Sequence, residues 1–187
     1  MKPESILLEL ILQKLGIDFN IETLNDRIRL QKIVYLLQRC GVNLGYKYSW
    51  YTYGPYSRDL TSVYYDLDAS LKCNEKDYTW YKLDEDVKEL QKGIDDFKKI
   101  SKIPAGVLIA DNPNKSKDVA WLEFIASIDY LHNSLSRPTS ISEKDIKAFT
   151  EDEKSNLVLA GNFENSYNAA MTVLEKAGLV KIPYPDN

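Results

Sequence analysis

The sequence predicts a mainly helical domain of the α+β class: a compact helical unit with a small antiparallel β-hairpin that carries a Tyr-Gly-Pro-Tyr-Ser turn at residues 53–57. Apolar residues recur at intervals of three and four along most of the chain, as in amphipathic helices. The alternation typical of a strand is found over Tyr46–Tyr53. The 187 residues suffice for one hydrophobic core and contain no repeat or low-complexity linker, so we expect a single domain over residues 1–187.

Two helices are expected before residue 41. An apolar stripe predicts a first helix that ends at Gly16, because glycine readily adopts the left-handed conformation that closes a helix. A second helix starts near Asn25 or Asp26, either of which can cap it, and continues to Gly41. The stripes consist of Ile6, Leu7, Leu10, Ile11 and Leu15 in the first helix and of Leu30, Ile33, Val34, Leu37 and Cys40 in the second.

A strand and a third helix are expected next. Gly54-Pro55 is predicted to end the strand over Tyr46–Tyr53. Ser57 can then cap a helix whose apolar stripe extends from Leu60 to Leu71. Residues 78–83 predict a second strand that pairs with the first. The two faces of the first strand are formed by Tyr46, Tyr48, Trp50 and Thr52, and by Lys47, Ser49, Tyr51 and Tyr53.

The C-terminal part of the chain is expected to contain four more helices. Apolar stripes predict three of them, over residues 84–100, 119–131 and 165–176. Acidic residues at the start of the first favour a helix N-terminus, where the backbone dipole is positive. Ser142 and Asp145 have the spacing of a capping box, which predicts a short fourth helix at that point.

Charge is distributed unevenly along the chain. The net charge is −4, yet the window from Arg27 to Arg58 contains six basic residues and no acid, so the remainder carries −10. Such a window can meet a polyanion in spite of the acidic total, because the local field governs contact. The alternative is that these basic residues pair with the chain's own acidic segment, Asp84 to Asp96.

Few residues in the sequence suit catalysis. His132 is the single histidine, the two cysteines Cys40 and Cys73 form no metal-binding pattern, and no glycine-rich phosphate loop occurs. Cys40 lies on the inner stripe of its helix and is expected to fill the core. We therefore expect no enzyme activity, no cofactor and no metal. Free cysteines and the lack of a long apolar stretch predict a cytoplasmic protein that does not enter the membrane.

The candidate binding surface combines basic and aromatic residues of the acid-free window. Six of its seven aromatic residues fall between Tyr46 and Tyr56. Tyrosines offer broad contact area to a protein partner, or planes on which bases stack. Arg29 and Lys32 are expected to share one helical face that contacts phosphates or carboxylates. The alternative is that Trp50, Tyr53 and Tyr56 only pack the small sheet onto the helices. The predicted partner-binding residues are Arg29, Lys32, Trp50, Tyr51, Tyr53, Tyr56 and Arg58.

Part of this window resembles two related families. The helix segment of residues 29–38, followed by a glycine turn, an aromatic strand and the segment Tyr53-Gly-Pro-Tyr-Ser-Arg-Asp-Leu60, resembles the YwgA-like group of prokaryotic proteins. More distantly it resembles the Panacea, or SocA-like, antitoxin domain. Tyr56-Ser57 after the Gly-Pro pair favours the YwgA-like group. The resemblance covers residues 25–71, about a quarter of the chain. The Panacea resemblance implies a non-enzymatic helical domain that neutralises a toxin or delivers it to a protease.

Two functions follow as expectations. The first is a non-catalytic binding module for a protein partner, with a toxin as the candidate partner. The second is a nucleic-acid-binding regulator of the winged-helix type, in which the hairpin forms the wing. Residues 174–180, Leu-Glu-Lys-Ala-Gly-Leu-Val, resemble the end of a winged-helix recognition helix. A steep loss of affinity with rising salt would indicate the nucleic-acid binder.

Overall fold

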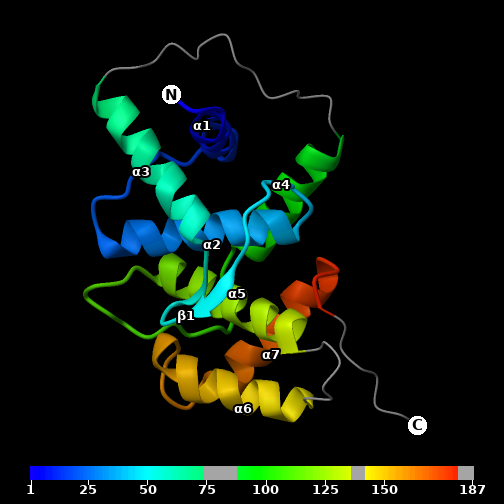
Figure 1. Ribbon diagram of the computed structural model, residues 1–187. Helices are drawn as coiled ribbons and strands as arrows, with labels where there is room; N and C mark the ends of the chain where they lie inside the picture. Colours follow the sequence, from blue (N-terminus) through cyan, green and yellow to red (C-terminus); the bar gives the residue numbers. More distant parts are fainter. Residues whose placement is uncertain (74–87, 136–141, 181–187) are drawn as a thin grey trace.

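The computed structural model describes residues 1–73, 88–135 and 142–180 (Figure 1). These residues form seven α-helices, one short 3-10 helix and a two-stranded antiparallel sheet. The prediction of a mainly helical domain with a small β-hairpin is confirmed. The elements are α1 (Pro3–Leu15), α2 (Leu24–Arg39), β1 (Ser49–Tyr51), β2 (Gly54–Tyr56), α3 (Arg58–Lys72), α4 (Lys88–Ile100), α5 (Lys117–Leu135), α6 (Glu143–Lys154), the 3-10 helix Ser155–Leu157 and α7 (Phe163–Lys176).

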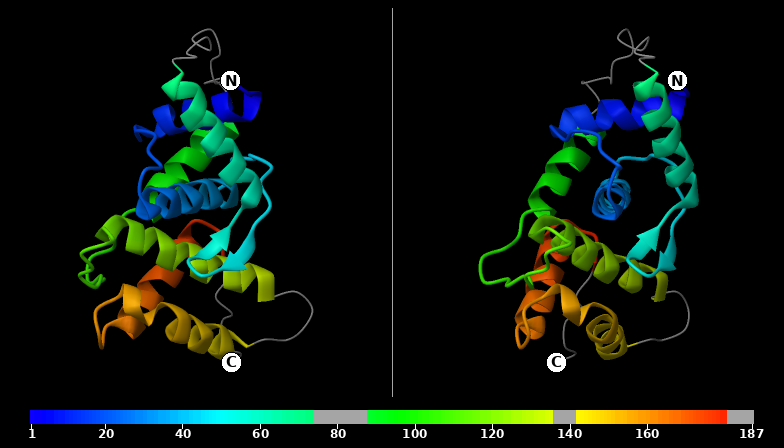
Figure 2. Two further views of the ribbon diagram at one scale, coloured as in Figure 1. Left: turned by 60° about the vertical axis from the view of Figure 1, so that its left-hand side comes forward. Right: turned by 90° about the vertical axis from the view of Figure 1, so that its left-hand side faces the viewer.

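Helices α2 and α5 lie at the centre of the arrangement and pack against each other. On one side α1 and α3 pack together above α2, and on the other α6 and α7 pack against α5 (Figures 1 and 2). The hairpin lies at the edge of the molecule, where β2 contacts both α2 and α5. The two central helices therefore form the support on which the hairpin rests.

Most helix ends follow the sequence expectations. Gly16 closes α1 with a positive φ of 71°. Ser57 caps α3, and Ser142 forms a capping box with Asp145 at the start of α6. The expected cap of α2 is wrong: Thr23 is the cap, and Asp26 is its partner in a capping box. Asp26 is the third residue of the helix, and its carboxylate accepts a hydrogen bond from the Thr23 backbone N–H at 2.9 Å.

The hairpin differs from its prediction in where the chain turns. Gly54 and Pro55 do not end a strand; they belong to β2, in which Pro55 is paired with Trp50 of β1. The turn is formed by residues 52–53, between the paired Tyr51 and Gly54. A two-stranded ribbon has only edge strands, so a proline without an N–H group is tolerated there. The partner strand expected at residues 78–83 lies outside the described residues.

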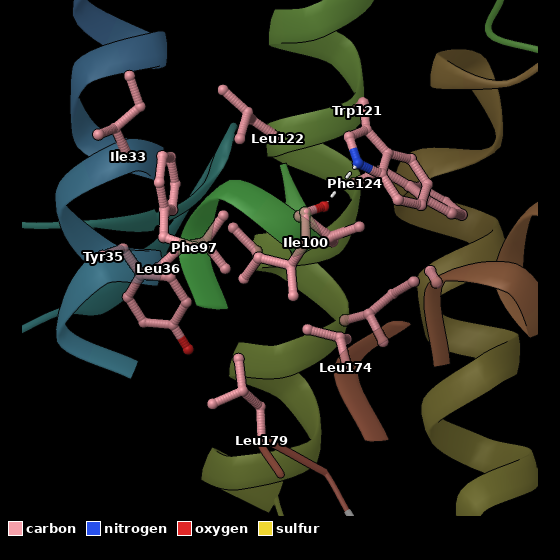
Figure 3. Close-up of a cluster of buried hydrophobic side chains, with 14 of the residues drawn as sticks. Ile33, Tyr35, Leu36, Phe97, Ile100, Trp121, Leu122, Phe124, Leu174 and Leu179 are labelled. Atoms are coloured by element: carbon pink, nitrogen blue, oxygen red, sulfur yellow. Dashed lines mark hydrogen bonds between the residues drawn. The ribbon is translucent and has the colours of Figure 1, made fainter. Parts of the chain in front are cut away.

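Helix α5 is the centre of the larger apolar core (Figure 3). Trp121 and Phe124 have exposed fractions of 0%. The Trp121 Nε1–H donates to the backbone oxygen of Ile100 at 3.0 Å, which satisfies the indole inside the core. Cys40 belongs to this core, as expected from its helical stripe. The predicted stripe is buried throughout, at Val119, Leu122, Ile125, Ile128 and Leu131.

A second, smaller apolar cluster joins α1, α2 and α3. Tyr64 and Leu67 of α3 are buried in it against Leu30 and Val34 of α2. The cluster packs the middle of α3 against the other two helices. Within the described ranges, no helix has the length and apolar character needed to cross a bilayer.

Candidate functional site

A pocket of about 150 Å³ opens beside the hairpin, which we call the tyrosine pocket. Four tyrosines contribute to it: Tyr51 and Tyr53 from the tip of the hairpin, Tyr56 from β2 and Tyr64 from α3. The other wall is helix α2. Lys32, Tyr51, Tyr53 and Tyr56 were predicted from the sequence, so the structure brings four of the seven candidate residues together. The remaining lining residues are Leu24, Arg27, Ile28, Gln31 and Gly54.

The mouth of the tyrosine pocket is formed by exposed apolar side chains. Tyr51 is 61% exposed and Leu24 is 50% exposed. The rings of Tyr51 and Tyr56 have centroids 5.5 Å apart. The Tyr56 hydroxyl accepts a hydrogen bond from the Thr61 hydroxyl at 2.8 Å, which fixes the ring relative to α3. An opening with these side chains can receive an apolar group without rearrangement of the helices.

Gln31 joins α2 to the start of α3. Its side-chain oxygen accepts from the Ser57 backbone N–H at 2.9 Å, and its amide donates to the Ser57 oxygen at 2.9 Å. This pair of bonds fixes the segment that follows β2. The sequence offered no sign of this role, because the two residues lie 26 positions apart.

Lys32 is buried at the inner end of the pocket. The prediction that it shares an exposed basic face with Arg29 is wrong, because Lys32 is 2% exposed and its amine donates to the Pro55 oxygen at 2.7 Å. Helix α2 turns this side toward the hairpin, which covers it. Arg29 is half-buried and lines a small recess against α1, together with Asp18 and residues of the α1–α2 connection.

A cluster of buried charges lies under the hairpin, which we call the lysine cluster: Lys32, Lys115, Lys154 and Glu123. The Glu123 carboxylate accepts from Lys154 at 3.1 Å and from Lys115. Lys154 also donates to the backbone oxygen of Thr52 in the hairpin turn, at 2.9 Å. Two lysines, Lys154 and Lys115, therefore share one carboxylate, and Lys154 and Lys32 each donate to a carbonyl group of the hairpin.

The buried surroundings of Lys32 disfavour its charged form. Burial lowers the pKa of Lys32 to about 7. Glu123 opposes this shift, and the neighbouring Lys154 and Lys115 add to it. Near neutral pH a substantial fraction of the Lys32 amine therefore carries no charge.

Aromatic rings of the hairpin lie over the other two lysines. The Lys154 amine is 5.5 Å from the centroid of the Trp50 ring, and the Lys115 amine is 5.0 Å from that of Tyr53. Trp50 also contacts Tyr130 of α5, at 5.9 Å between centroids. Trp50 is half-buried and packs the sheet onto the helices, in agreement with the alternative stated for it, whereas Tyr53 is 37% exposed.

The last candidate residue, Arg58, is exposed in the first turn of α3. It follows Ser57 directly and so lies close to the end of β2. The structure thus separates Arg29, on the side of α1, from Arg58 on the hairpin side. Binding by the seven candidate residues stays a prediction, and four of them, Lys32, Tyr51, Tyr53 and Tyr56, line the tyrosine pocket.

Half of the basic window bonds to the protein itself. Arg27 donates to the backbone oxygen of Ile21 at 2.8 Å, Lys32 to that of Pro55, and Arg39 to the Asp129 carboxylate at 2.7 Å. The alternative prediction was that the basic window pairs with the segment Asp84 to Asp96. In the described part of that segment, residues 88–96, the acidic side chains with a bonded partner pair within α4 instead. Its side chains Asp95 and Asp96 bond to Gln91, Lys92 and Lys99 of α4.

Asp129 is the buried partner of Arg39. Its carboxylate also accepts from the Tyr35 hydroxyl at 2.6 Å. Burial raises the pKa of Asp129, and the hydrogen bond from Arg39 opposes that rise. Three groups satisfy this carboxylate, since the Asn133 amide donates to it as well, at 3.0 Å. The hydrogen bonds from Tyr35 and Arg39 to Asp129 therefore hold α2 against α5.

His132 lies on α5 with its Nε2 3.0 Å from the Tyr167 hydroxyl. Burial lowers the pKa of His132, with Asp129 acting in the opposite direction. Across residues 1–73, 88–135 and 142–180, no group of three or more histidine, cysteine, aspartate or glutamate side chains is arranged to hold a metal ion.

Sequence reasoning missed Glu123, Lys154 and Gly54. Glu123 and Ser127 lie four positions apart on α5, and both are buried. Comparisons of the chain with protein-family models, with curated proteins and with solved structures found no match. Membership of the YwgA-like or Panacea families stays a prediction.

Proposed function

We propose that this protein is a non-catalytic binding module that holds a protein partner by taking one of its apolar or aromatic side chains into the tyrosine pocket. The observation that carries the proposal is the convergence of Tyr51, Tyr53 and Tyr56, selected from the sequence, on one mostly apolar pocket. Cavities of about 150 Å³ with apolar walls accept a benzene ring. A phenylalanine, tyrosine or leucine side chain has a suitable size.

Exposure of the rim supports a protein partner. Tyr51 and Leu24 are large apolar side chains with more than a third of their surface in water, and they lie on opposite sides of one opening. Clustered exposed apolar groups of this kind mark interaction surfaces. Tyrosine is also enriched among the residues that dominate binding energy, because its rigid ring buries a large area at low entropic cost.

The charge of the segments that flank the hairpin favours a partner with acidic residues next to the inserted side chain. Arg58 and Lys47 are exposed on either side of the hairpin in sequence, and the window between them contains no acid. Opposite charge at the rim of an interface speeds association and orients the partner. A toxin with an acidic, aromatic surface segment would satisfy both requirements, in line with the Panacea resemblance. We place this activity in the cytoplasm.

The nucleic-acid alternative receives less support. Of the six basic residues in the window, Arg27, Lys32 and Arg39 bond to groups of the protein itself. Fewer basic side chains then remain for phosphates. In the segment that resembles a winged-helix recognition helix, Leu174, Leu179 and Val180 are buried in the core.

Affinity capture with matched variants tests the proposal. Wild-type protein, Tyr51→Ala and Tyr65→Ala are used to capture partners from cells of the source organism. Tyr65 is the control because it is 49% exposed on α3 but does not line the pocket. A partner retained by wild type and Tyr65→Ala, and at least about tenfold weaker with Tyr51→Ala, supports the proposal. Equal retention by both variants would contradict it.

Salt dependence separates the two candidate functions. Binding of the captured molecule is measured by calorimetry at salt concentrations from about 50 to about 300 mM. A partner held by an apolar side chain in the pocket loses little affinity with rising salt. Recovery of nucleic acid, with affinity that falls steeply with salt, would favour the winged-helix alternative instead.

A further inference from the structure

The two edges of the hairpin differ in their backbone hydrogen bonds. Pro55 of β2 has no N–H group, and its oxygen accepts from the buried Lys32 amine at 2.7 Å. Of the two strands, β2 is the one that packs against α2 and α5. The edge of β2 is therefore covered by the protein itself and offers no place for a further strand.

The edge of β1 has a free donor and a free acceptor. Trp50 is paired with Pro55, which cannot donate, so the ladder bonds are made by the residue pairs on either side of it. The backbone N–H and oxygen of Trp50 then point away from β2. In the described part of the chain, no group bonds to either of them. Unpaired groups of this kind are a template for another strand.

Aromatic side chains lie on both faces of this edge. Side chains alternate along a strand, so Tyr51 lies on the opposite face from Trp50. Tyr51 is 61% exposed. On the other face, Phe149 of α6 is 41% exposed and its ring centroid lies 5.8 Å from that of Trp50. A strand added beside β1 therefore has an apolar contact on each face.

The charge of this part of the chain selects the occupant. The window from Arg27 to Arg58 contains no acid, and Lys47, two residues before β1, is exposed. A second copy of this chain paired through the same edge would bring two such windows together, and repulsion between like charges opposes that arrangement. An acidic strand of another protein is attracted instead.

We propose that β1 accepts an extended acidic segment of a protein partner as a third, antiparallel strand. Antiparallel pairing lets one partner residue use both free groups of Trp50. The partner residues opposite Tyr51 and Lys47 are then four positions apart, as Tyr51 and Lys47 are in this chain. The motif is an aromatic residue that contacts the Tyr51 ring, followed four positions later by an acidic residue on the side of Lys47.

The inference rests on the proposed function in one respect, because the partner is the same protein. It adds the conformation of the bound segment and the spacing of its side chains. The tyrosine pocket lies between the hairpin and α2, whereas the added strand lies along the other edge of the hairpin. The two contacts are therefore separate and can be tested separately.

Binding of a defined peptide tests the proposal on the full chain alone. The probe is acetyl-Glu-Val-Phe-Val-Thr-Val-Glu-amide, in which a glutamate follows the phenylalanine by four positions. Binding and backbone hydrogen exchange are measured by NMR on isotope-labelled protein. We expect exchange of the Trp50 N–H to slow at least about tenfold when the peptide is saturating. No binding at about 2 mM peptide, or a bound peptide that leaves this exchange rate unchanged, would overturn the proposal.

Two methylated peptides separate backbone pairing from side-chain contact. N-methylation of the central valine, which lies opposite Trp50, removes the donor to the Trp50 oxygen. N-methylation of the threonine that follows blocks an N–H that points away from β1, so this peptide is the matched control. The dissociation constant should be at least about tenfold higher for the first peptide than for the second. Equal dissociation constants would contradict a third strand.

A charge reversal tests the choice of occupant. Lys47→Glu should raise the dissociation constant of the peptide at least about threefold at low salt, whereas Lys98→Glu, at an exposed position of α4, should leave it unchanged. The same effect from both variants would show that net charge alone matters and would contradict the placement. A chain that is dimeric in sedimentation, with the Trp50 N–H protected before any peptide is added, would show that a second copy occupies the edge.

Failure of this inference differs from failure of the proposed function. A partner whose retention depends on Tyr51, combined with no binding of the peptide, would remove the third strand and leave the pocket. A peptide that pairs with Trp50 while no partner depends on the pocket tyrosines would do the reverse.

Discussion

The two sides of helix α5 are both buried, but they are built from different chemistry. One side packs Trp121 and Phe124 into the apolar core, where the ring of Phe124 lies 5.9 Å from that of Phe163 (Figure 3). The other side carries Glu123 and Ser127 under the hairpin, next to the lysine cluster. An apolar side is stabilised by the area it buries, whereas a charged side depends on every partner being present. The first side contributes stability through buried area, and the second supports the hairpin, whose tyrosines line the pocket.

Removal of the largest core side chain should have the largest effect. Trp121→Ala deletes a fully buried ring and leaves the Ile100 oxygen without its indole donor. We expect a loss of about 3–5 kcal/mol in the free energy of unfolding, measured by urea denaturation followed by circular dichroism. A loss below about 1 kcal/mol would mean that the core is not organised around α5.

Removal of the Glu123 carboxylate should destabilise the charged side of α5. Glu123→Ala leaves Lys154 and Lys115 buried without their shared carboxylate. We expect a loss of about 3 kcal/mol in the same measurement, since breaking a buried pair is more harmful than never having it. Glu175→Ala, at an exposed position of α7, should change stability by less than about 0.5 kcal/mol.

A double replacement sharpens the contrast. Glu123→Met combined with Lys154→Met removes both charges of one pair and fills the space with apolar atoms. We expect it to be less destabilising than Glu123→Ala alone, because fewer unpaired charges remain. If the double variant has the lower free energy of unfolding, the hydrogen bond from Lys154 to the Thr52 oxygen contributes more to stability than the charge balance does.

Gly54 should tolerate no side chain. Its φ is +82°, and a Cβ would stand 2.4 Å from the Ser127 hydroxyl oxygen. Gly54→Ala should therefore lower the free energy of unfolding by about 2 kcal/mol, from backbone strain and from the clash. Gly161→Ala is the control, since its φ is +80° with nothing within 4 Å, and it should show the strain of about 1 kcal/mol alone. Equal losses in both variants would contradict the close approach of the hairpin to α5.

The pH dependence of stability should identify Lys32. Its pKa is about 7 in the folded chain and near 10.4 when unfolded, so between these values the unfolded state binds more protons. Stability contributed by this group is therefore lowest below pH 7 and recovers as pH rises. Wild-type stability relative to Lys32→Met should increase by about 1 kcal/mol per pH unit between pH 7 and 9. The difference cancels the tyrosines and cysteines that titrate in both proteins, and a flat difference would contradict a buried, poorly stabilised amine.

Local signals in the sequence predicted most of the helices. Gly16, Ser57 and Ser142 act through neighbours a few positions away, so their roles could be inferred from spacing alone. Thr23 was passed over for Asn25 and Asp26, because all of them can cap a helix and only the geometry distinguishes them. Pro55 was expected to end a strand, and its place in a strand depends on which strands pair, since the described residues form a sheet of two strands only.

The candidate site was predicted only in part, because sequence patterns reveal groups that are close in sequence and not contacts between distant residues. The tyrosines of the hairpin could be selected as a group because they are close in sequence, and they line one pocket. The burial of Lys32 was missed because it depends on the hairpin folding over α2. Glu123 and Lys154 are 31 positions apart, and their pairing is set by the packing of α6 on α5. No local pattern in the sequence encodes such a contact.

One binding measurement decides whether stability resides in the core around α5 and binding in the tyrosines of the hairpin. The double variant Tyr51→Ala/Tyr53→Ala removes two exposed rings from the rim of the pocket and none from the core. We expect its free energy of unfolding to lie within about 0.5 kcal/mol of wild type. Its dissociation constant for the captured partner, measured by calorimetry, should rise by at least about tenfold. A folded double variant that binds the partner as tightly as wild type would contradict the assignment of the tyrosine pocket as the binding site.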